Sequence, residues 1–131
     1  PSPSATFFPK LTQANTSFFE FGWTPGADPW ATLNSIVRTH DGAGSGQFNG
    51  GRYSNPKLDA VIDGIRVEPD LATRRRMVGD ALRLMHDDLP LIPLYRRTLA
   101  WVMRPSIEVA MWPSDVLELR WVRIDGSSKA P

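Results

Sequence analysis

The segment at residues 49–65, NGGRYSNPKLDAVIDGI, constrains the fold most, because it contains a helix start and the end of the loop that precedes it. The side-chain oxygen of Asn55 suits a helix N-cap, and Pro56 suits the first helical position, where no amide hydrogen is needed. Apolar residues then recur at helical spacing, at Leu58, Val61, Ile62 and Ile65. We therefore predict a helix from Pro56 to about Val67.

A glycine-rich segment, residues 41–51, lies directly before this helix. Glycine has high conformational freedom, so this segment is predicted to be a mobile loop without regular structure. Arg52 and Tyr53 then lie at the junction of a loop with a fixed helix, a position that often lines a binding site.

Three other helices are predicted from cap residues and apolar periodicity. They cover residues 1–14, a segment that Pro29 opens and that runs through Val37, and a segment from the Asp70 cap to about Asp88. Within the last of these, Arg74, Arg75 and Arg76 belong to a stretch of alternating charge, so they are interpreted as a solvated helix face.

Four strands are predicted from β-branched, aromatic and apolar residues, at residues 17–23, 91–95, 99–103 and 116–124. In the first strand, every second residue is a large aromatic one: Phe19, Phe21 and Trp23. This alternation indicates that at least one face of the strand is buried. The polar tail, residues 125–131, is expected to be disordered.

Composition narrows the class of protein without naming a function. The chain has 131 residues and a formal net charge of +1, which fits about one globular domain and gives no electrostatic case for binding nucleic acid or an anionic membrane. It contains no cysteine, which excludes disulfides and thiolate chemistry. No apolar run is long enough to span a bilayer, and no signal peptide is visible.

The sequence offers no catalytic, metal or cofactor residues. The only histidines, His40 and His86, have no ligand-like spacing. The glycine-rich segment 42–47 lacks the glycine and the Lys-Ser or Lys-Thr pair that phosphate-binding loops require. Asp59 and Asp63 share one helix face, for which solvent exposure is the simplest interpretation. We therefore expect a binding protein, not an enzyme.

Four motifs carry a family resemblance. In chain order they are Gly22-Trp23 followed by Asp28-Pro29, the stretch from Tyr53 to Asp59, the arginine-rich helix start at 74–76, and the stretch from Asp88 to Tyr95. In this order they resemble the C-terminal part of the extracytoplasmic solute-binding proteins of ABC importers in the oligopeptide, dipeptide and nickel class, often called family 5. The resemblance spans about residues 18–124.

The resemblance implies a fold and a function. The fold would be α/β (mixed α+β), the C-terminal part of a two-lobed, periplasmic-binding-protein-like (type II) structure with a mixed sheet covered by helices. Residues 1–24 would form a helix and a lobe-crossing strand, residues 25–124 a segment of the C-terminal lobe, and residues 125–131 the tail of what is expected to be a fragment of a longer protein. Such a protein captures a small polar solute, such as a peptide, in the periplasm and delivers it to a membrane permease.

Five residues are expected to bind the ligand, namely Gly22, Trp23, Thr24, Asp28 and Arg97. The indole of Trp23 provides a flat contact surface, and the glycine beside it permits close approach of a ligand. In peptide-binding relatives, an aspartate shortly after this tryptophan meets the ligand's amino group. Here Thr24 follows instead, and Asp28 belongs to the later Asp-Pro element, so the ligand class stays open: Asp28 would suit a cation, and Arg97 an anion.

Two further expectations concern partners. The apolar strands are expected to pair with strands of a missing portion, so the chain alone would associate with itself. An alternative from another class is a small α+β interaction domain without a transport role, in which Trp112 and the Arg96-Arg97 pair form a protein contact.

Overall fold

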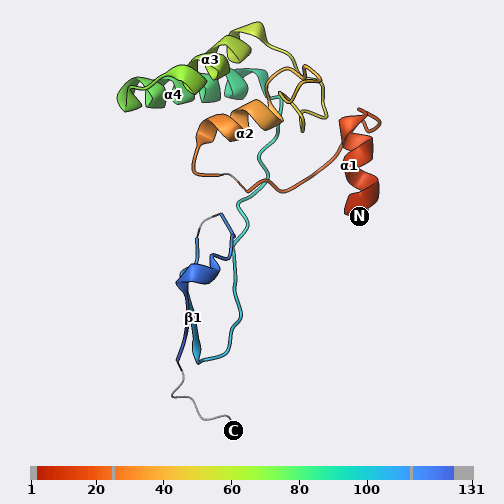
Figure 1. Ribbon diagram of the computed structural model, residues 1–131. Coiled ribbons are helices and arrows are strands. Elements are labelled where there is room, and N and C mark those ends of the chain that lie inside the picture. Colours follow the sequence, from red (N-terminus) through yellow and green to blue (C-terminus); the bar gives the residue numbers. More distant parts are fainter. Residues whose placement is uncertain (1–2, 25, 113, 126–131) are drawn as a thin grey trace. The chain divides into compact units, whose positions relative to one another are not determined.

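The computed structural model describes residues 3–24, 26–112 and 114–125. The chain is α+β and consists of two compact units, Pro1–Pro93 and Leu94–Pro131 (Figure 1). The first unit contains the helices α1 (Ser4–Thr12), α2 (Pro29–Ile36), α3 (Pro56–Val67) and α4 (Leu71–Asp88). The second contains the strand β1 (Ile107–Val109), a 3-10 turn (Leu119–Trp121) and the strand β2 (Val122–Ile124). Of the predicted disordered tail, all but Asp125 lies outside the described residues.

Local cap chemistry starts three of the helices where the sequence predicts. The side chain of Asp28 accepts a hydrogen bond from the Trp30 amide of α2, and Asp70 accepts one from the Thr73 amide of α4. Asn55 accepts hydrogen bonds from two amides in the first turn of α3, and Pro56 occupies the first helical position. The predicted helix Pro56–Val67 is thereby confirmed.

The core of the first unit lies where α3 packs against α2 and α4, which run side by side with it in Figure 1. Its buried members all belong to the apolar stripes of these helices and the residue after α2: Leu33, Val37, Leu58, Ile62, Ile65 and Ala81. Burial of the leucine, valine and isoleucine side chains among them contributes about 1.5–3 kcal/mol each. The helices therefore depend on each other for stability.

Helix α1 docks on the glycine-rich loop through apolar side chains, of which Leu11 is the most buried. Leu11 is fully buried, and a Cβ on Gly50 would overlap Leu11 Cδ1 and touch the ring of Phe19. Glycine is thus required at position 50 for close packing and not for its backbone freedom. Arg52, which has a positive φ of 53°, donates a hydrogen bond of 2.8 Å to the Thr12 carbonyl and ties the end of α1 to the same loop.

The strand predictions are largely wrong. Residues 17–23, 91–95 and 99–103 form no strand in the described part of the chain, and only Val122–Ile124 of the predicted strand 116–124 is one. It pairs in antiparallel register with β1, which the sequence did not predict, so that Glu108 faces Arg123. A strand needs a partner for its backbone groups, and for these segments the described chain supplies none.

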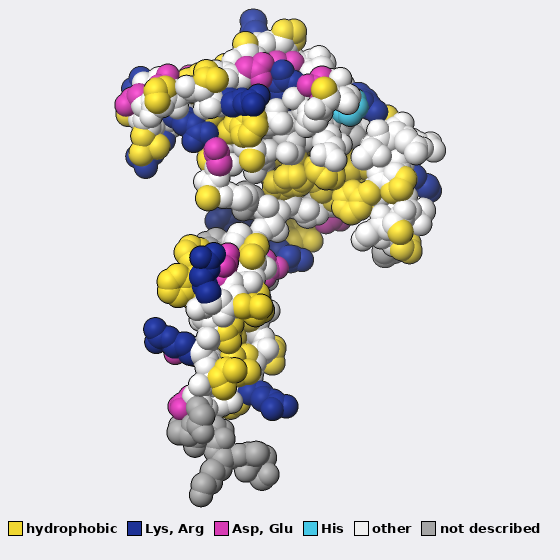
Figure 2. Space-filling view, in the orientation of Figure 1, with side chains coloured by type: hydrophobic (Ala, Val, Ile, Leu, Met, Phe, Trp, Pro, Cys, Tyr) yellow, Lys and Arg dark blue, Asp and Glu magenta, His cyan; other side chains and the backbone are white. Residues whose placement is uncertain are grey.

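Large apolar side chains consequently remain on the surface of the second unit (Figure 2). Val102 is fully exposed, and Tyr95, Leu119 and Ile124 are each 75% exposed. An isolated two-stranded hairpin is at best marginally stable in water. The second unit thus lacks a core of buried apolar residues among those described.

Candidate functional site

Six aromatic side chains of the first unit form a closed ring of contacts. Neighbouring ring centroids lie 5.3–6.4 Å apart, and most pairs meet edge to face. Such pairs contribute about 0.5–1.5 kcal/mol beyond their buried area. The members come from α1, from the segment before α2 and from the glycine-rich loop: Phe7, Phe8, Phe19, Phe21, Trp23 and Phe48.

This ring explains the alternation seen in the sequence. Phe19, Phe21 and Trp23 do lie on one side and contact each other in series, while Phe18 is 83% exposed. The predicted face is confirmed although the predicted strand is wrong. These three side chains lie on one side because they pack against each other, against α1 and against the glycine-rich loop, and no neighbouring strand is needed.

Trp23 is fixed at the start of α2. Its indole Nε1 donates a 3.2 Å hydrogen bond to Thr32 Oγ1, and its ring packs edge to face on Phe48. The two residues that flank it, Gly22 and Thr24, are exposed. A Cβ on Gly22 would meet no atom within 4 Å, so the space beside this backbone is open.

The backbone around Trp23 has free hydrogen-bonding capacity. Among the described residues, no backbone–backbone hydrogen bond involves Gly22, Trp23 or Thr24. An exposed backbone segment beside a fixed aromatic side chain can bind an extended ligand through its amides and carbonyls. Gly22, Trp23 and Thr24 therefore form one continuous candidate surface, which we call the Trp23 segment.

Asp28, expected to bind a cationic ligand, already has protein partners. Its Oδ1 accepts the Trp30 amide at 2.9 Å, and Arg74 Nη2 lies 2.8 Å from both carboxylate oxygens. The hydrogen bond from Arg74 holds the pKa of the Asp28 carboxyl below its usual range. A ligand amine at this carboxylate would have to compete with Arg74.

The interpretation of residues 74–76 as a solvated helix face is wrong for Arg74. Besides its pair with Asp28, its Nε donates a 2.9 Å hydrogen bond to the carbonyl of Ile65, near the end of α3. Arg74 is thus half-buried, whereas Arg75 and Arg76 are exposed as predicted. Its partners lie 9 and 46 residues away, so helix periodicity alone does not identify them.

Arg97, the second charged candidate, belongs to the second unit. It is exposed, and its Nη2 lies 3.5 Å from Asp115 Oδ2. The other oxygen of Asp115 accepts a 3.0 Å hydrogen bond from the indole of Trp101. The Arg97 side chain is 69% exposed, and a guanidinium has five N–H donors, which leaves donors for an anion.

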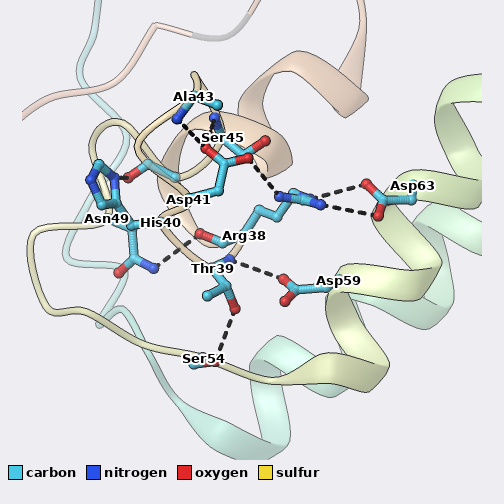
Figure 3. Close-up of polar contacts among 11 residues, drawn as sticks. Arg38, Thr39, His40, Asp41, Ala43, Ser45, Asn49, Ser54, Asp59 and Asp63 are labelled. Carbon is cyan, nitrogen blue, oxygen red and sulfur yellow. Dashed lines mark hydrogen bonds and ion pairs between the residues drawn. The ribbon is translucent and has the colours of Figure 1, made fainter.

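A polar network holds the glycine-rich loop against α3 (Figure 3). Arg38 donates from Nε and Nη2 to the two oxygens of Asp63, at 3.0 and 3.1 Å, and the Thr39 amide donates to Asp59 Oδ1 at 2.9 Å. Asp63 is exposed as expected, whereas Asp59 is half-buried, and both accept hydrogen bonds from the residues between α2 and the glycine-rich loop. Two parallel hydrogen bonds from a planar guanidinium to a carboxylate form a strong and specific pair, and Arg38 and Asp63 form such a pair.

Asn49 is the buried polar residue at the centre of this network. It is 6% exposed, donates to the carbonyls of Arg38 and Tyr53, and accepts the Tyr53 amide. The same loop contains Asp41, whose carboxylate accepts the amides of Ala43 and Ser45, and these bonds lower the pKa of Asp41 to about 2. The loop predicted to be mobile is therefore connected by several hydrogen bonds, which a count of glycines does not reveal.

The described residues hold no group of three or more histidine, cysteine or acidic side chains placed to bind a metal ion. None of the described helices is long and apolar enough to cross a membrane. In the second unit, an open pocket of about 360 Å³ is lined by Trp112, Ser114, Val116, Glu118, Arg120 and Trp121.

Comparison with known proteins finds a match over 64 residues, which is 49% of this chain. Over these residues it is 33% identical to uncharacterized lipoproteins of Mycobacterium tuberculosis and Mycobacterium bovis. The match covers 11% of each lipoprotein, so the chain spans only a small part of their length. No family model matches the chain, and no solved structure matches it.

Proposed function

We propose that the chain is the C-terminal part of an extracytoplasmic solute-binding protein of an ABC importer, with the two-lobed type II fold. It binds a small polar solute, such as a peptide or a related molecule, between two lobes and delivers it to a membrane permease. Closure of the lobes around the bound solute creates the form that docks on the permease. The chain catalyses no reaction.

The observation that carries this proposal is the Trp23 segment. Gly22 and Thr24, on either side of Trp23, are exposed. The indole of Trp23 donates a hydrogen bond to Thr32 and packs against Phe48. A rigid aromatic side chain gives a ligand apolar contact at low entropic cost, and the adjoining amides and carbonyls supply directional hydrogen bonds. Four motifs that resemble the family, in the family's order, agree with a ligand at this segment.

The lipoprotein relatives support the proposed location. A covalent lipid anchors a protein to a membrane surface without a transmembrane helix. An anchored binding protein on the outer side of the cytoplasmic membrane remains close to its permease. We therefore place this protein in the cell envelope, facing the extracytoplasmic side.

The exposed apolar residues of the second unit support a longer protein. Val102, Leu119 and Ile124 are at least 75% exposed, and contiguous exposed apolar surface in a soluble protein usually marks an interface. Strands from other parts of the polypeptide would cover these residues and complete the sheet. The chain matches only 11% of the length of each lipoprotein, which agrees with a longer protein of which this chain is a part.

A thermal-shift screen of the complete gene product tests the function. Peptides, amines, sugars and metal chelates are added separately, and a bound ligand raises the unfolding temperature by mass action. The proposal predicts a concentration-dependent rise with one class. Loss of uptake of the same solute on deletion of the gene would support the transport role, and unchanged uptake would count against it.

One observation favours the alternative function. Trp112 and Trp121 are about half exposed and line the open pocket of the second unit, as a protein-interaction site would require. An interaction domain predicts that no solute raises the unfolding temperature. It also predicts no permease and ATPase genes beside this one.

A further inference from the structure

Asp28 and Arg74 form an ion pair at the start of α2, and their two charges neutralise one another. The free amides of a helix N-terminus, together with the helix dipole, attract anions. Here the carboxylate of Asp28 already occupies that position and accepts the Trp30 amide. A ligand phosphate or carboxylate would therefore find the anion position at the N-terminus of α2 already filled.

The same carboxylate is already paired with a cation of the protein. Arg74 Nη2 contacts both of its oxygens, and Arg74 Nε is used by the carbonyl of Ile65. A ligand ammonium would have to displace a guanidinium that the protein itself holds in place. The pair of Asp28 and Arg74 thus presents no net charge to a ligand.

The Trp23 segment itself brings no charge. The sequence from Phe21 to Ala27, FGWTPGA, contains no ionisable side chain. Thr24 is exposed and offers a hydroxyl group, and Trp23 offers an apolar ring. Glu20 is the nearest charged residue on the N-terminal side; it is exposed and already takes part in an interaction.

We propose that the part of the ligand held at the Trp23 segment is uncharged and polar, and that the Asp28–Arg74 pair excludes charged ligand groups from the start of α2. This inference rests on the proposed solute-binding function. The ligand group bound at this segment is therefore neutral, such as the interior of a peptide and not one of its charged ends. Recognition there uses backbone hydrogen bonds and contact with the indole.

Three forms of one tripeptide, Ala-Phe-Ala, test the proposal on the complete gene product by calorimetry. One form is acetylated and amidated, one has a free amino group, and one has a free carboxylate. A charge-assisted hydrogen bond changes affinity by about tenfold or more, so the three dissociation constants should agree within about threefold if no charge is recognised. Raising the salt concentration should leave them unchanged.

Substitutions at the pair identify the cause. Arg74→Met leaves the charge of Asp28 unbalanced and should give the free-amine peptide an advantage of about tenfold over the blocked form. Arg75→Met, which removes an exposed charge on the same helix, should not. The variants' unfolding midpoints show that each is folded.

A wild-type protein that binds the free-amine peptide about tenfold more tightly than the blocked one, with the difference lost in Asp28→Asn or in Glu20→Gln, would overturn the inference. That result leaves the proposed function intact, because a charged solute is still a solute. The proposed function fails separately, if no class of solute raises the unfolding temperature of the complete gene product.

Discussion

The phenol of Tyr53 donates a 2.6 Å hydrogen bond to Asp88 Oδ2, which joins the residues before α3 to the last residue of α4. The same oxygen accepts a 2.6 Å hydrogen bond from Asn55, the N-cap of α3. Burial and, after it, the hydrogen bond to Asp88 raise the pKa of Tyr53 from its ordinary value of 10 to about 12. The hydrogen bond from Tyr53 lowers the pKa of Asp88.

This pair predicts a dependence of stability on alkaline pH. The folded state holds the Tyr53 proton more tightly than the unfolded state, so the stabilisation is complete below pH 10 and is lost as the pH rises to about 12. In Tyr53→Phe, the free energy of unfolding measured with urea should no longer show this loss over the same pH range. Tyr95→Phe, the matched control, should keep it. An unchanged alkaline slope in Tyr53→Phe would show that Tyr53 is not its source.

A second prediction concerns the N-cap of α2. Asp28→Ala removes both the cap and the partner of Arg74, and should lower the unfolding free energy by about 1 kcal/mol. Asp28→Asn should cost less, because asparagine is also a good N-cap. Since the pKa of Asp28 is lowered in the folded state, its stabilisation is present above its ordinary value of 3.8 and is lost as the pH falls through the folded value. Equal unfolding free energies of wild type and Asp28→Ala at neutral pH would contradict the capping role.

A third prediction tests the docking of α1. Gly50→Ala places a methyl group against Leu11 and Phe19 and should destabilise the first unit by about 1–3 kcal/mol, the usual cost of overpacking. Gly51→Ala is the control, because a Cβ there meets no atom within 4 Å. Hydrogen exchange at the α1 amides should rise in the first variant only. Similar exchange in both variants would mean that α1 does not pack on the loop as described.

A fourth prediction concerns the core around α3. Leu58 is fully buried, so Leu58→Ala should lower the unfolding free energy by about 2–5 kcal/mol. Leu82, in the middle of α4, is 53% exposed, and Leu82→Ala should change the unfolding free energy by less than about 0.5 kcal/mol. Urea unfolding measures both. A large loss at Leu82 would indicate a partner surface that covers α4.

Local chemistry made the helices predictable. Asp28, Asn55 and Asp70 each cap a helix within three residues of themselves, and the apolar period that follows is visible in the sequence. The face on which Phe19, Phe21 and Trp23 lie was predictable for the same reason. Each of these signals spans only a few residues.

Contacts between distant residues were not predictable. Strand pairing depends on a partner segment, so apolar content at residues 99–103 could not show whether a partner exists. The bond between Asp28 and Arg74 joins residues 46 positions apart, and that between Arg38 and Asp63 joins residues 25 apart. A single sequence gives no indication of such pairs, although they determine which charges remain available to a ligand.

The central claim is that Trp23 contacts a solute. Trp23→Ala removes the ring, while Thr32→Val removes only the acceptor of its indole hydrogen bond and leaves the indole itself present. Trp112→Ala, at a tryptophan of the second unit that is 49% exposed, is the matched control for loss of an indole. Urea unfolding of each variant confirms that it is folded before binding is measured.

The most direct test is isothermal titration of the complete gene product with the solute found in the thermal-shift screen. Trp23→Ala should weaken binding by about 1–3 kcal/mol, the range for a buried aromatic anchor, whereas Trp112→Ala should leave it unchanged. Unchanged affinity in a folded Trp23→Ala protein would contradict the account and place Trp23 in the core of the first unit alone.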